Sequence, residues 1–338
     1  MDMLRSFSRY IYNDCEDIDS LYACFRGENT MGSNEAGVRT NADLSMLSAF
    51  LCRYDRHEPR LALMAEKTLR YAVHTHKAVM RKACKDGRYW GSTSVADHQW
   101  ESSLWAMSVA YSAFFQWKGL DSLMRDDVYR LLKAECDYEL ERDIPTGYIG
   151  DTKAEENGWE VDVLAAALGL FPDDALAPRW FQRMREFAVN SYSHPSDADN
   201  HTIPDPWYDN STISSMYRGA NLYPDWTLQN HDFFHTSYQN VVIQELGEAA
   251  LALRLFQGDR QKWKSETLLH NCDSVTQNVL NWLTLPDGEQ AMPNGNDWSL
   301  FLYDQVTSYS TMACMRGDAD ALLFEQQALR KIARRQQT

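Results

Sequence analysis

The sequence predicts an all-α protein built from helical hairpins. Along most of the chain, apolar residues recur at steps of three and four, the period of an amphipathic helix. Strand-like alternation of polar and apolar residues is scarce. Pairs of predicted helices repeat with a period of several tens of residues, which is typical of stacked or ring-closed helix pairs. We therefore expect one helical domain over residues 1–338.

The elements follow from caps, breakers and periodicity. Asn41 is placed to cap a helix, and Pro172 ends one. The predicted helices cover about 3–12, 41–54, 58–80, 102–117, 123–142, 154–171, 174–191, 235–256, 259–283, 299–315 and 318–335. A long loop over 192–229 interrupts the hairpins, and loops of this length are usually functional or disordered. Its aromatic residues argue against disorder.

Composition and charge exclude several classes of function. The net charge is −15, and the only basic block lies at 330–335, so the field of the chain repels nucleic acid and anionic membranes. Acidic sugars stay open as substrates if a few Arg and Lys line a cleft. The 11 Trp and 17 Tyr fill a large core and leave rings over for a sugar-binding cleft, although any single Trp is more often a core residue.

The cysteines and the N-terminus indicate an intracellular compartment. Seven scattered Cys without a Cys-x-x-Cys pair argue against both a disulfide framework and a zinc ribbon. Neither a signal peptide nor an apolar run of membrane-spanning length is visible. We expect a cytoplasmic protein, unless a leader has been removed. The sequence does not indicate an oligomeric state.

Polar clusters precede the first helix of successive hairpins. They lie before Asn41 and at 97–101, 151–157, 230–238 and 294–297. If these first helices all point the same way, their entrances converge on one rim. Side chains far apart in sequence would then meet in one cleft.

The densest cluster runs from Gln229 to Asn240. A general base needs hydrogen-bond reach to its proton and a pKa near the working pH, which favours His and sometimes Tyr, so His231, His235 and Tyr238 are candidates. If the helix begins near His235, then Tyr238 lies one turn inside it, and His231 projects from the preceding loop. One His or Tyr at a helix start is usually a half-buried cap. The density of titratable and amide groups here favours a site.

The architecture resembles the α/α toroid enzymes that act on carbohydrates, a superfamily of polysaccharide lyases and glycoside hydrolases. Five hairpins plus the helix at 3–12 correspond to a complete or incomplete toroid of five to six hairpins. The run from Asp225 to His231, with His235 and Tyr238, resembles the motif of hyaluronate-, chondroitin- and xanthan-type toroid lyases. Asn200 and His201 resemble the Asn-His pair of alginate- and heparin-type toroid lyases, in which Asn helps to neutralise the uronate carboxylate.

The resemblance implies a lyase that cleaves a uronic-acid-containing poly- or oligosaccharide by β-elimination. His231 and Tyr238 are the expected base and acid, in either order, with Asn200, His201 and His235 as further catalytic candidates. Donors that neutralise the carboxylate as charge develops are available at Asn200, Asn230, Arg218 and Arg39. The expected substrate-binding residues are Asn230, Arg218, Trp226, Asp97, Trp100, Glu156, Asn296, Asp297 and Trp298.

A glycoside hydrolase is the first alternative, because hydrolysis usually needs two carboxylates across the scissile bond. The candidates are Asp97, Glu101, Asp151, Glu155, Glu156 and Asp297. The helix dipole also favours Asp and Glu in first turns without any catalytic role.

Metal binding and a non-catalytic glycan-binding scaffold are weaker alternatives. No His-Glu-x-x-His spacing occurs, although His231 and His235 form an i, i+4 pair that would bind a metal if both lay on one helix. We expect no cofactor and no metal. A scaffold would repeat similar residues at equivalent positions, whereas these clusters differ from one another.

Overall fold

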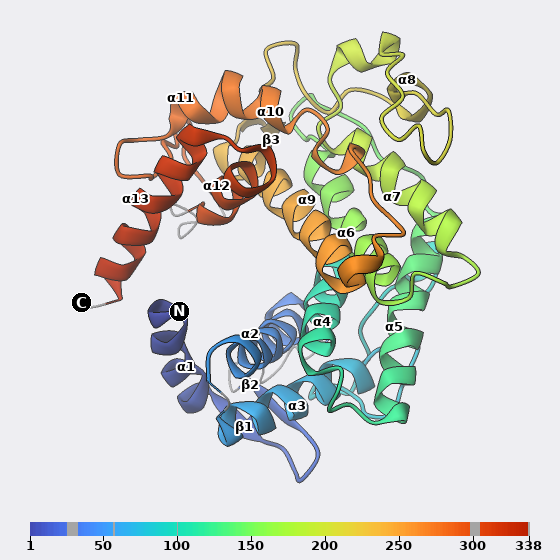
Figure 1. The fold of residues 1–338 in the computed structure, drawn as a ribbon, viewed down its shortest axis with the longest axis vertical. Helices are drawn as coiled ribbons and strands as arrows, with labels where there is room; N and C mark the ends of the chain where they lie inside the picture. The colour runs from blue at the N-terminus through green and yellow to red at the C-terminus, as the bar shows by residue number, and fades with distance from the viewer. Residues whose placement is uncertain (26–32, 57, 100, 298–304, 337–338) are drawn as a thin grey trace. The chain divides into compact units, whose positions relative to one another are not determined.

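The computed structural model describes residues 1–25, 33–56, 58–99, 101–297 and 305–336 (Figure 1). Helices make up 61% of the structure and strands 4%, so the prediction of an all-α protein is confirmed. Within the described ranges, no helix combines the length and the apolar character that crossing a membrane requires.

The helices are joined by loops and two small hairpins. The α-helices are α1 (Asp2–Asp14), α2 (Thr40–Tyr54), α3 (Pro59–His74), α4 (Ser102–Gln116), α5 (Ser122–Glu141), α6 (Ala154–Leu170), α7 (Ala177–Ser191), α8 (Ile213–Met216), α9 (Thr236–Gln257), α10 (Cys272–Val275), α11 (Asn281–Leu283), α12 (Val306–Thr311) and α13 (Ala319–Arg335). The strands β1 (Cys15–Asp17) and β2 (Ala23–Phe25) pair antiparallel, as do β3 (Gln229–Asn230) and β4 (Phe233–Phe234). Most predicted helices end within about three residues of these bounds.

The helix predicted over 58–80 is wrong over its last six residues. α3 ends at His74, where the Thr75 N–H bonds to Tyr71 O. The chain then turns, with Met80 at a φ of 52°, and the Lys77 N–H donates to Trp90 O at 2.8 Å. Contacts with residues far along the chain therefore outweigh the local periodicity.

The helix predicted over 259–283 is also wrong in its first half. Gln261 has a φ of 41°, which no α-helix accommodates. Asp205 accepts hydrogen bonds from Ser265 Oγ at 2.7 Å and from the Glu266 N–H at 2.9 Å. The chain is continuously helical from Cys272 to Leu283, through α10, a π-helical stretch over 276–280 and α11, so the end of the predicted helix is present. Of the helix predicted over 299–315, residues 299–304 lie outside the described residues, and α12 begins at Val306.

The chain forms two compact units, each made of three segments. Unit 1 comprises Met1–Arg142, Asp162–Trp180 and Leu255–Lys262, and unit 2 comprises Asp143–Val161, Phe181–Arg254 and Trp263–Thr338. The prediction of one toroidal domain stays a prediction.

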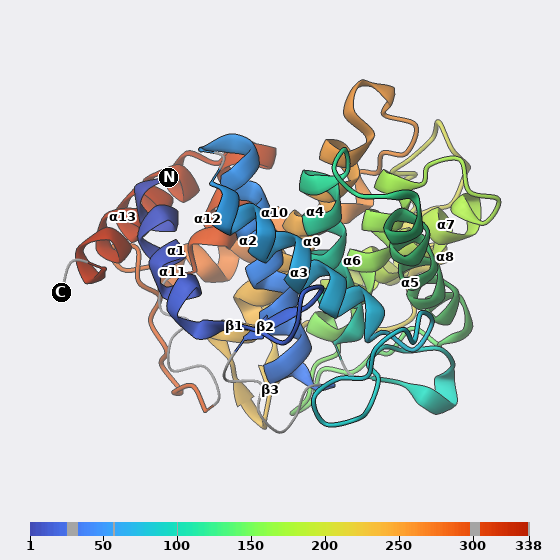
Figure 2. The ribbon, with the colours of Figure 1, turned by 90° about the horizontal axis from the view of Figure 1, so that it is seen from below.

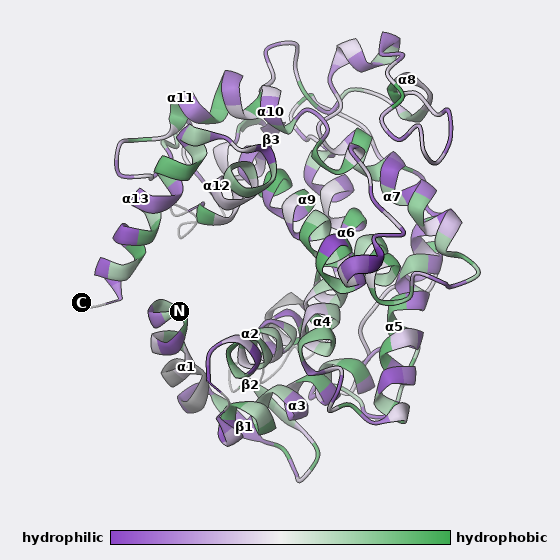
Figure 3. Cartoon of the chain, viewed as in Figure 1, coloured by the Kyte–Doolittle hydropathy of each residue, from purple (hydrophilic) through white to green (hydrophobic). Residues whose placement is uncertain are grey.

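In unit 1, α2 packs against both α3 and α4 (Figures 1 and 2). Ser45 of α2 joins the three helices, because its Oγ lies 2.6 Å from Ser112 Oγ and 2.7 Å from Ala65 O. Trp90, Trp105 and Met107 are buried in this core. Figure 3 shows α4 mostly white and green, in keeping with a helix that is buried on most sides.

In unit 2, a buried arginine holds the long loop over 192–229. Arg185 of α7 pairs with Asp205 at 2.8 Å and with Asp209 at 2.9 Å. Arg185 and Asp205 have no exposed side-chain surface. Removing one partner would leave a buried charge unpaired, so this contact keeps the loop ordered.

The last helix of unit 2, α13, alternates purple and green in Figure 3, as an amphipathic surface helix does.

Candidate functional site

The hairpin of β3 and β4 in unit 2 presents the first histidine of the site. Its two-residue turn consists of His231 and Asp232, whose φ angles are 52° and 67°. Two left-handed residues at this place define a type I′ turn, which usually takes Asn-Gly. Non-glycine residues in such conformations cost free energy and concentrate at functional sites. The turn therefore projects His231 at a cost in backbone strain.

The loop before α6 anchors this hairpin. The Thr152 N–H donates to Gln229 O at 2.7 Å, and the Asp232 N–H donates to Gly150 O at 2.8 Å. Gly150 has a φ of 73°, and a Cβ there would meet Asp232 Oδ1 at 2.5 Å. Glycine adopts this φ without strain, and any larger residue would also force the Asp232 side chain to move.

One carboxylate joins both histidines of the cluster. His231 Nδ1 lies 2.7 Å from Asp297 Oδ2, and His235 Nε2 lies 3.2 Å from Asp297 Oδ1. Loss of hydration acts to raise the pKa of the Asp297 carboxyl, but the hydrogen bonds from both histidines outweigh it and lower that pKa. Burial lowers the pKa of His235, although Asp297 acts in the opposite direction.

Aromatic rings enclose the two imidazoles. The Tyr238 ring lies edge-on to both, with centroids 5.6 Å from His231 and 4.7 Å from His235. Phe233 stacks on His235 at 4.8 Å. His235 immediately precedes α9 and Tyr238 lies in its first turn, as the sequence predicted. The rings restrict the rotation of the His235 imidazole.

The segment that carries Asp297 is bound to the start of α9. Asn296 Nδ2 donates to Ser237 Oγ at 2.9 Å, and Thr236 Oγ1 donates to Ala291 O at 3.1 Å. These contacts bring two predicted polar clusters together, at 230–238 and 294–297. Trp298 lies outside the described residues.

A third polar cluster, at 151–157, reaches the hairpin through Asn230. Asn230 Nδ2 donates to Glu155 Oε1 at 2.9 Å and lies 3.4 Å from Asp151 Oδ1. Glu155 is only 2% exposed, and among the described residues its Oε2 has no hydrogen-bond partner. Burial, assisted by the charge of Glu156, raises the pKa of Glu155 to about 8. Glu155 is thus a carboxyl group that holds its proton at neutral pH.

The other residues predicted in unit 2 bond elsewhere. Asn200 accepts from the Thr202 N–H at 3.1 Å, and His201 Nδ1 lies 3.3 Å from Ser214 Oγ. Arg218 donates to Ser215 O at 2.9 Å, and Glu156 pairs with Lys153 at 2.7 Å. Trp226, with a φ of 71°, stacks on His194 at 4.0 Å. None of these hydrogen bonds, ion pairs or ring contacts involves His231 or Asp297.

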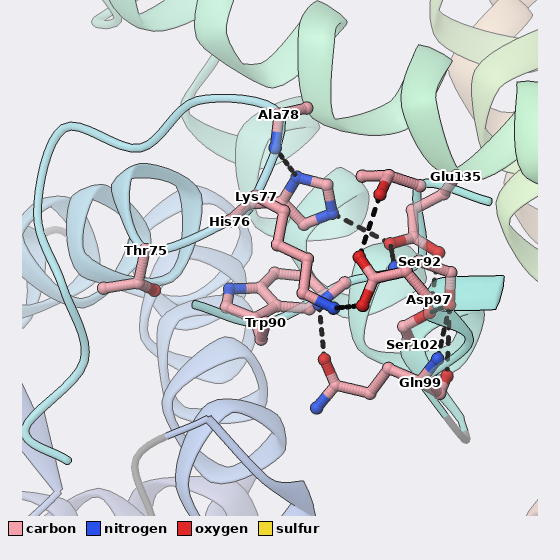
Figure 4. Close-up of polar contacts among 12 residues, drawn as sticks. Thr75, His76, Lys77, Ala78, Trp90, Ser92, Asp97, Gln99, Ser102 and Glu135 are labelled. Atoms are coloured by element: carbon pink, nitrogen blue, oxygen red, sulfur yellow. Dashed lines mark hydrogen bonds and ion pairs between the residues drawn. The ribbon is translucent and has the colours of Figure 1, made fainter. Parts of the chain in front are cut away.

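Asp97 belongs to unit 1 and lies in the cluster of Figure 4. Its carboxylate accepts from Lys77 Nζ at 2.7 Å and from Thr93 Oγ1 at 3.0 Å. Trp100, the other predicted residue of this segment, lies outside the described residues. Asp97 is therefore held by a surface ion pair and a hydroxyl.

Beside Asp97, Figure 4 shows a buried network that sequence reasoning missed. Glu135 Oε1 lies 2.8 Å from His76 Nε2 and accepts from the Ser92 N–H at 2.7 Å, while Ser102 Oγ donates to Oε2 at 2.6 Å. Both Glu135 oxygens are thus satisfied inside unit 1, which indicates a structural role. No local pattern pairs His76 with a residue 59 positions away.

A Tyr–His–Asp chain in the same unit was missed for the same reason. Tyr22 Oη lies 2.9 Å from His74 Nδ1, and His74 Nε2 lies 3.3 Å from Asp127 Oδ2. Arg81 holds the Asp127 carboxylate from the other side, with Nη2 at 2.9 Å from Oδ1. The arginine neutralises the carboxylate, which favours a structural ion pair.

Comparison with known proteins places the chain in no family. No family model, no curated protein and no solved structure matches it. The fold and the site therefore define only a class of protein: an all-α protein with a solvent-accessible His–Asp–His cluster beside a tyrosine. Its donor atoms lie within 4.8 Å of one another, an arrangement whose residue types are suited to proton transfer or to metal binding.

Proposed function

We propose that the protein is a lyase that cleaves a uronic-acid-containing poly- or oligosaccharide by β-elimination. The observation that carries this proposal is the 2.7 Å contact between His231 Nδ1 and Asp297 Oδ2. A carboxylate on Nδ1 fixes the tautomer and leaves Nε2 as the proton acceptor. The His231 side chain is 45% exposed, so a substrate can reach it.

The proposed reaction moves one proton off C5 of the uronate and one onto the leaving oxygen. His231 Nε2 takes the C5 proton, and the electron pair forms the C4–C5 double bond as the C4–O bond breaks. Tyr238 donates its proton to the departing oxygen, which becomes the new hydroxyl end. The proton on His231 then restores Tyr238, directly or through water. No water molecule is consumed, which distinguishes elimination from hydrolysis.

Amide and guanidinium donors would neutralise the carboxylate as negative charge develops on it. Asn230 already donates to Glu155, so its amide is held in place rather than aimed at a ligand. The proposal therefore assigns this role to Asn200, whose bond to Thr202 uses Oδ1 rather than the amide nitrogen, and to Arg218, whose side chain is 42% exposed.

The test is the ultraviolet absorbance of the conjugated unsaturated uronate, followed on a panel of uronate-containing glycans. Absorbance should rise with the wild-type chain and stay flat with His231→Asn, since Asn tolerates the left-handed turn but accepts no proton. Tyr238→Phe should slow the reaction about 100-fold or more. Tyr54→Phe, a half-exposed tyrosine of unit 1, is the matched control. Unchanged rates in both site variants would refute the proposal.

A hydrolase is the second candidate, and Glu155 is the observation that favours it. A buried carboxyl with a pKa of about 8 is protonated at neutral pH, as a general acid must be. New reducing ends without the absorbance, abolished in Glu155→Gln, would establish this reaction instead. Binding of a glycan with no product of either kind would leave the non-catalytic scaffold.

The α/α toroid belongs to the same proposal. The pairs α2–α3 and α4–α5 are successive helices packed within unit 1, as helical hairpins require. A ring of such pairs would collect the helix entrances on one rim. Small-angle scattering of the full chain, compared with curves calculated for closed and open rings, tests this arrangement.

A further inference from the structure

We infer that His231, His235 and Asp297 form a binding site for one divalent transition-metal ion. Each residue offers one ligand atom, and these atoms lie within 4.8 Å of one another. Two ligand atoms bonded to the same ion at about 2.0–2.2 Å lie at most about 4.4 Å apart, so these atoms must draw slightly closer together to bind one ion. The cluster therefore needs only small side-chain adjustments to close around an ion. This inference does not rest on the proposed elimination.

The donor set selects the kind of ion. Imidazole nitrogen suits Zn²⁺, Fe²⁺, Co²⁺ and Cu²⁺, whereas Ca²⁺ and Mg²⁺ take oxygen ligands. Two histidines and one carboxylate with open positions form a set that occurs in catalytic zinc sites and non-haem iron sites. We therefore expect Zn²⁺ and Co²⁺ to bind and Ca²⁺ and Mg²⁺ not to bind.

Access to the cluster is graded from buried to open. The His235 side chain has no exposed surface, while His231 and Asp297 are 45% and 48% exposed. A bound ion would thus have the buried His235 on its inner side, and solvent would reach the ion from the side of His231 and Asp297. Three protein ligands leave at least one position for water or substrate, which is the arrangement of a catalytic rather than a structural metal site.

All three ligands are held in place before an ion arrives. The strained turn fixes His231, Phe233 and Tyr238 pack on the His235 ring, and Asn296 ties the residue before Asp297 to Ser237. Pre-organised ligands lose little conformational freedom on binding. This favours a tight site rather than an adventitious contact.

The local charge also favours a cation. The ion pairs of Asp297 are with His231 and His235, and no lysine or arginine of the described residues neutralises it. Asp232 adjoins the cluster in the turn, and Asp151 lies against Asn230. Lys153, which pairs with Asp151, also pairs with Glu156, so its charge is already balanced by two carboxylates.

An ion and the proposed proton transfer would compete for the same atoms. A metal bonded to His231 Nδ1 and to Asp297 replaces their hydrogen bond, and Nε2 of His231 then carries a proton and accepts none. Where both proposals hold, Zn²⁺ inhibits elimination and a chelator restores it.

The experiment is a calorimetric titration of Zn²⁺ into the untagged, chelator-treated full chain, with the visible d–d spectrum of Co²⁺ as a second readout. We expect one ion per chain and a Co²⁺ spectrum of low-symmetry coordination. Asp297→Asn and His231→Asn, both at half-exposed positions, should each weaken binding about 100-fold or more. His201→Ala removes an exposed imidazole elsewhere in unit 2 and should leave binding unchanged.

Two results would overturn the inference. One is a wild-type chain that binds Zn²⁺ more weakly than about 1 mM. The other is Asp297→Asn and His231→Asn variants that bind it as tightly as the wild-type chain, with circular dichroism showing that they fold. Elimination by a chain that binds no metal would refute the metal site and support the lyase. Metal binding without elimination on any glycan would support the metal site and refute the lyase.

Discussion

Asp297 is the residue on which both proposals converge. Its two oxygens contact two different imidazoles, so one side chain sets the orientation of a buried and an exposed histidine. A shared carboxylate of this kind serves as an orienting group in proton transfer and as a ligand in metal binding. Replacing it by its isosteric amide separates geometry from charge.

For Asp297→Asn we expect the elimination rate to fall about 100-fold or more, because the amide no longer stabilises the imidazolium that forms on His231. The absorbance of the unsaturated uronate measures this rate. Asp232→Asn, in the same turn, is the matched control and should keep most of the activity. Equal losses in the two variants would show that the cluster responds to charge in general rather than to Asp297.

Glu155 is the second residue whose setting predicts a measurable effect. Its pKa is about 8 in the folded chain against an ordinary value of 4.5, so the folded state binds the proton more tightly than the unfolded state. The resulting stabilisation is fully present below about pH 4.5 and is lost as the pH rises through 8. The difference corresponds to on the order of 5 kcal/mol between these limits.

In the wild-type chain, the free energy of unfolding should decrease between about pH 5 and about pH 8.5, and Glu155→Gln should make this decrease smaller. Gln stays neutral and still accepts the hydrogen bond from Asn230. Urea unfolding across this range measures the slope. Glu156→Gln removes only the smaller contribution to the raised pKa of Glu155 and leaves its burial intact, so it should flatten the slope much less than Glu155→Gln. A slope shared by the wild-type chain and Glu155→Gln would contradict the assigned cause.

At the scale of elements, the β3–β4 hairpin trades stability for the position of His231. Its turn contains His and Asp where Asn-Gly would be favoured, and it is tied to the loop before α6 by backbone hydrogen bonds. The role proposed for His231 therefore conflicts with the backbone preference of this turn. The conflict itself is an argument for a site.

The double variant His231→Asn and Asp232→Gly should melt at the same temperature as the wild-type chain or higher. Relief of the two left-handed residues is expected to stabilise the fold by about 1 kcal/mol, while the elimination activity is lost. Thermal unfolding and the absorbance assay measure the two effects. Gly150→Ala should act in the opposite sense, because its Cβ would meet Asp232. A lower melting temperature for the double variant would refute the account of strain.

At the scale of the whole molecule, each unit is assembled from segments far apart in the chain. In unit 1, Phe256 lies 4.6 Å from Phe114 and 4.9 Å from Tyr111, and Phe171 lies 5.0 Å from Tyr129. The first 142 residues alone therefore lack rings that complete their own core. Unit 1 depends on residues 162–180 and 255–262.

A fragment of residues 1–142 should consequently lose the cooperative thermal transition of the full chain and bind an apolar dye. Its exposed aromatic rings and missing helices leave the core incomplete. Circular dichroism and dye fluorescence check this against the full chain. A sharp transition in the fragment would show that the first segment of unit 1 folds on its own.

The sequence by itself determined the local features of this protein. The helices α4, α5, α6, α7, α9 and α13 were predicted within a few residues, because amphipathic periodicity and caps act over single turns. The residues of the cluster were also named in advance: His231, His235, Tyr238 and Asp297. Their chemistry is a property of residue type, which needs no fold to be recognised.

The tertiary structure decided which of these residues meet. It paired His231 with Asp297 across 66 positions and Glu155 with Asn230 across 75, and it ended α3 at His74 against the helical periodicity. Asn200, His201 and Arg218 were named alongside them but bond within their own part of the chain. Local propensity is set by neighbours within about one helical turn. Contacts between distant segments depend on how whole elements pack, which no local pattern encodes.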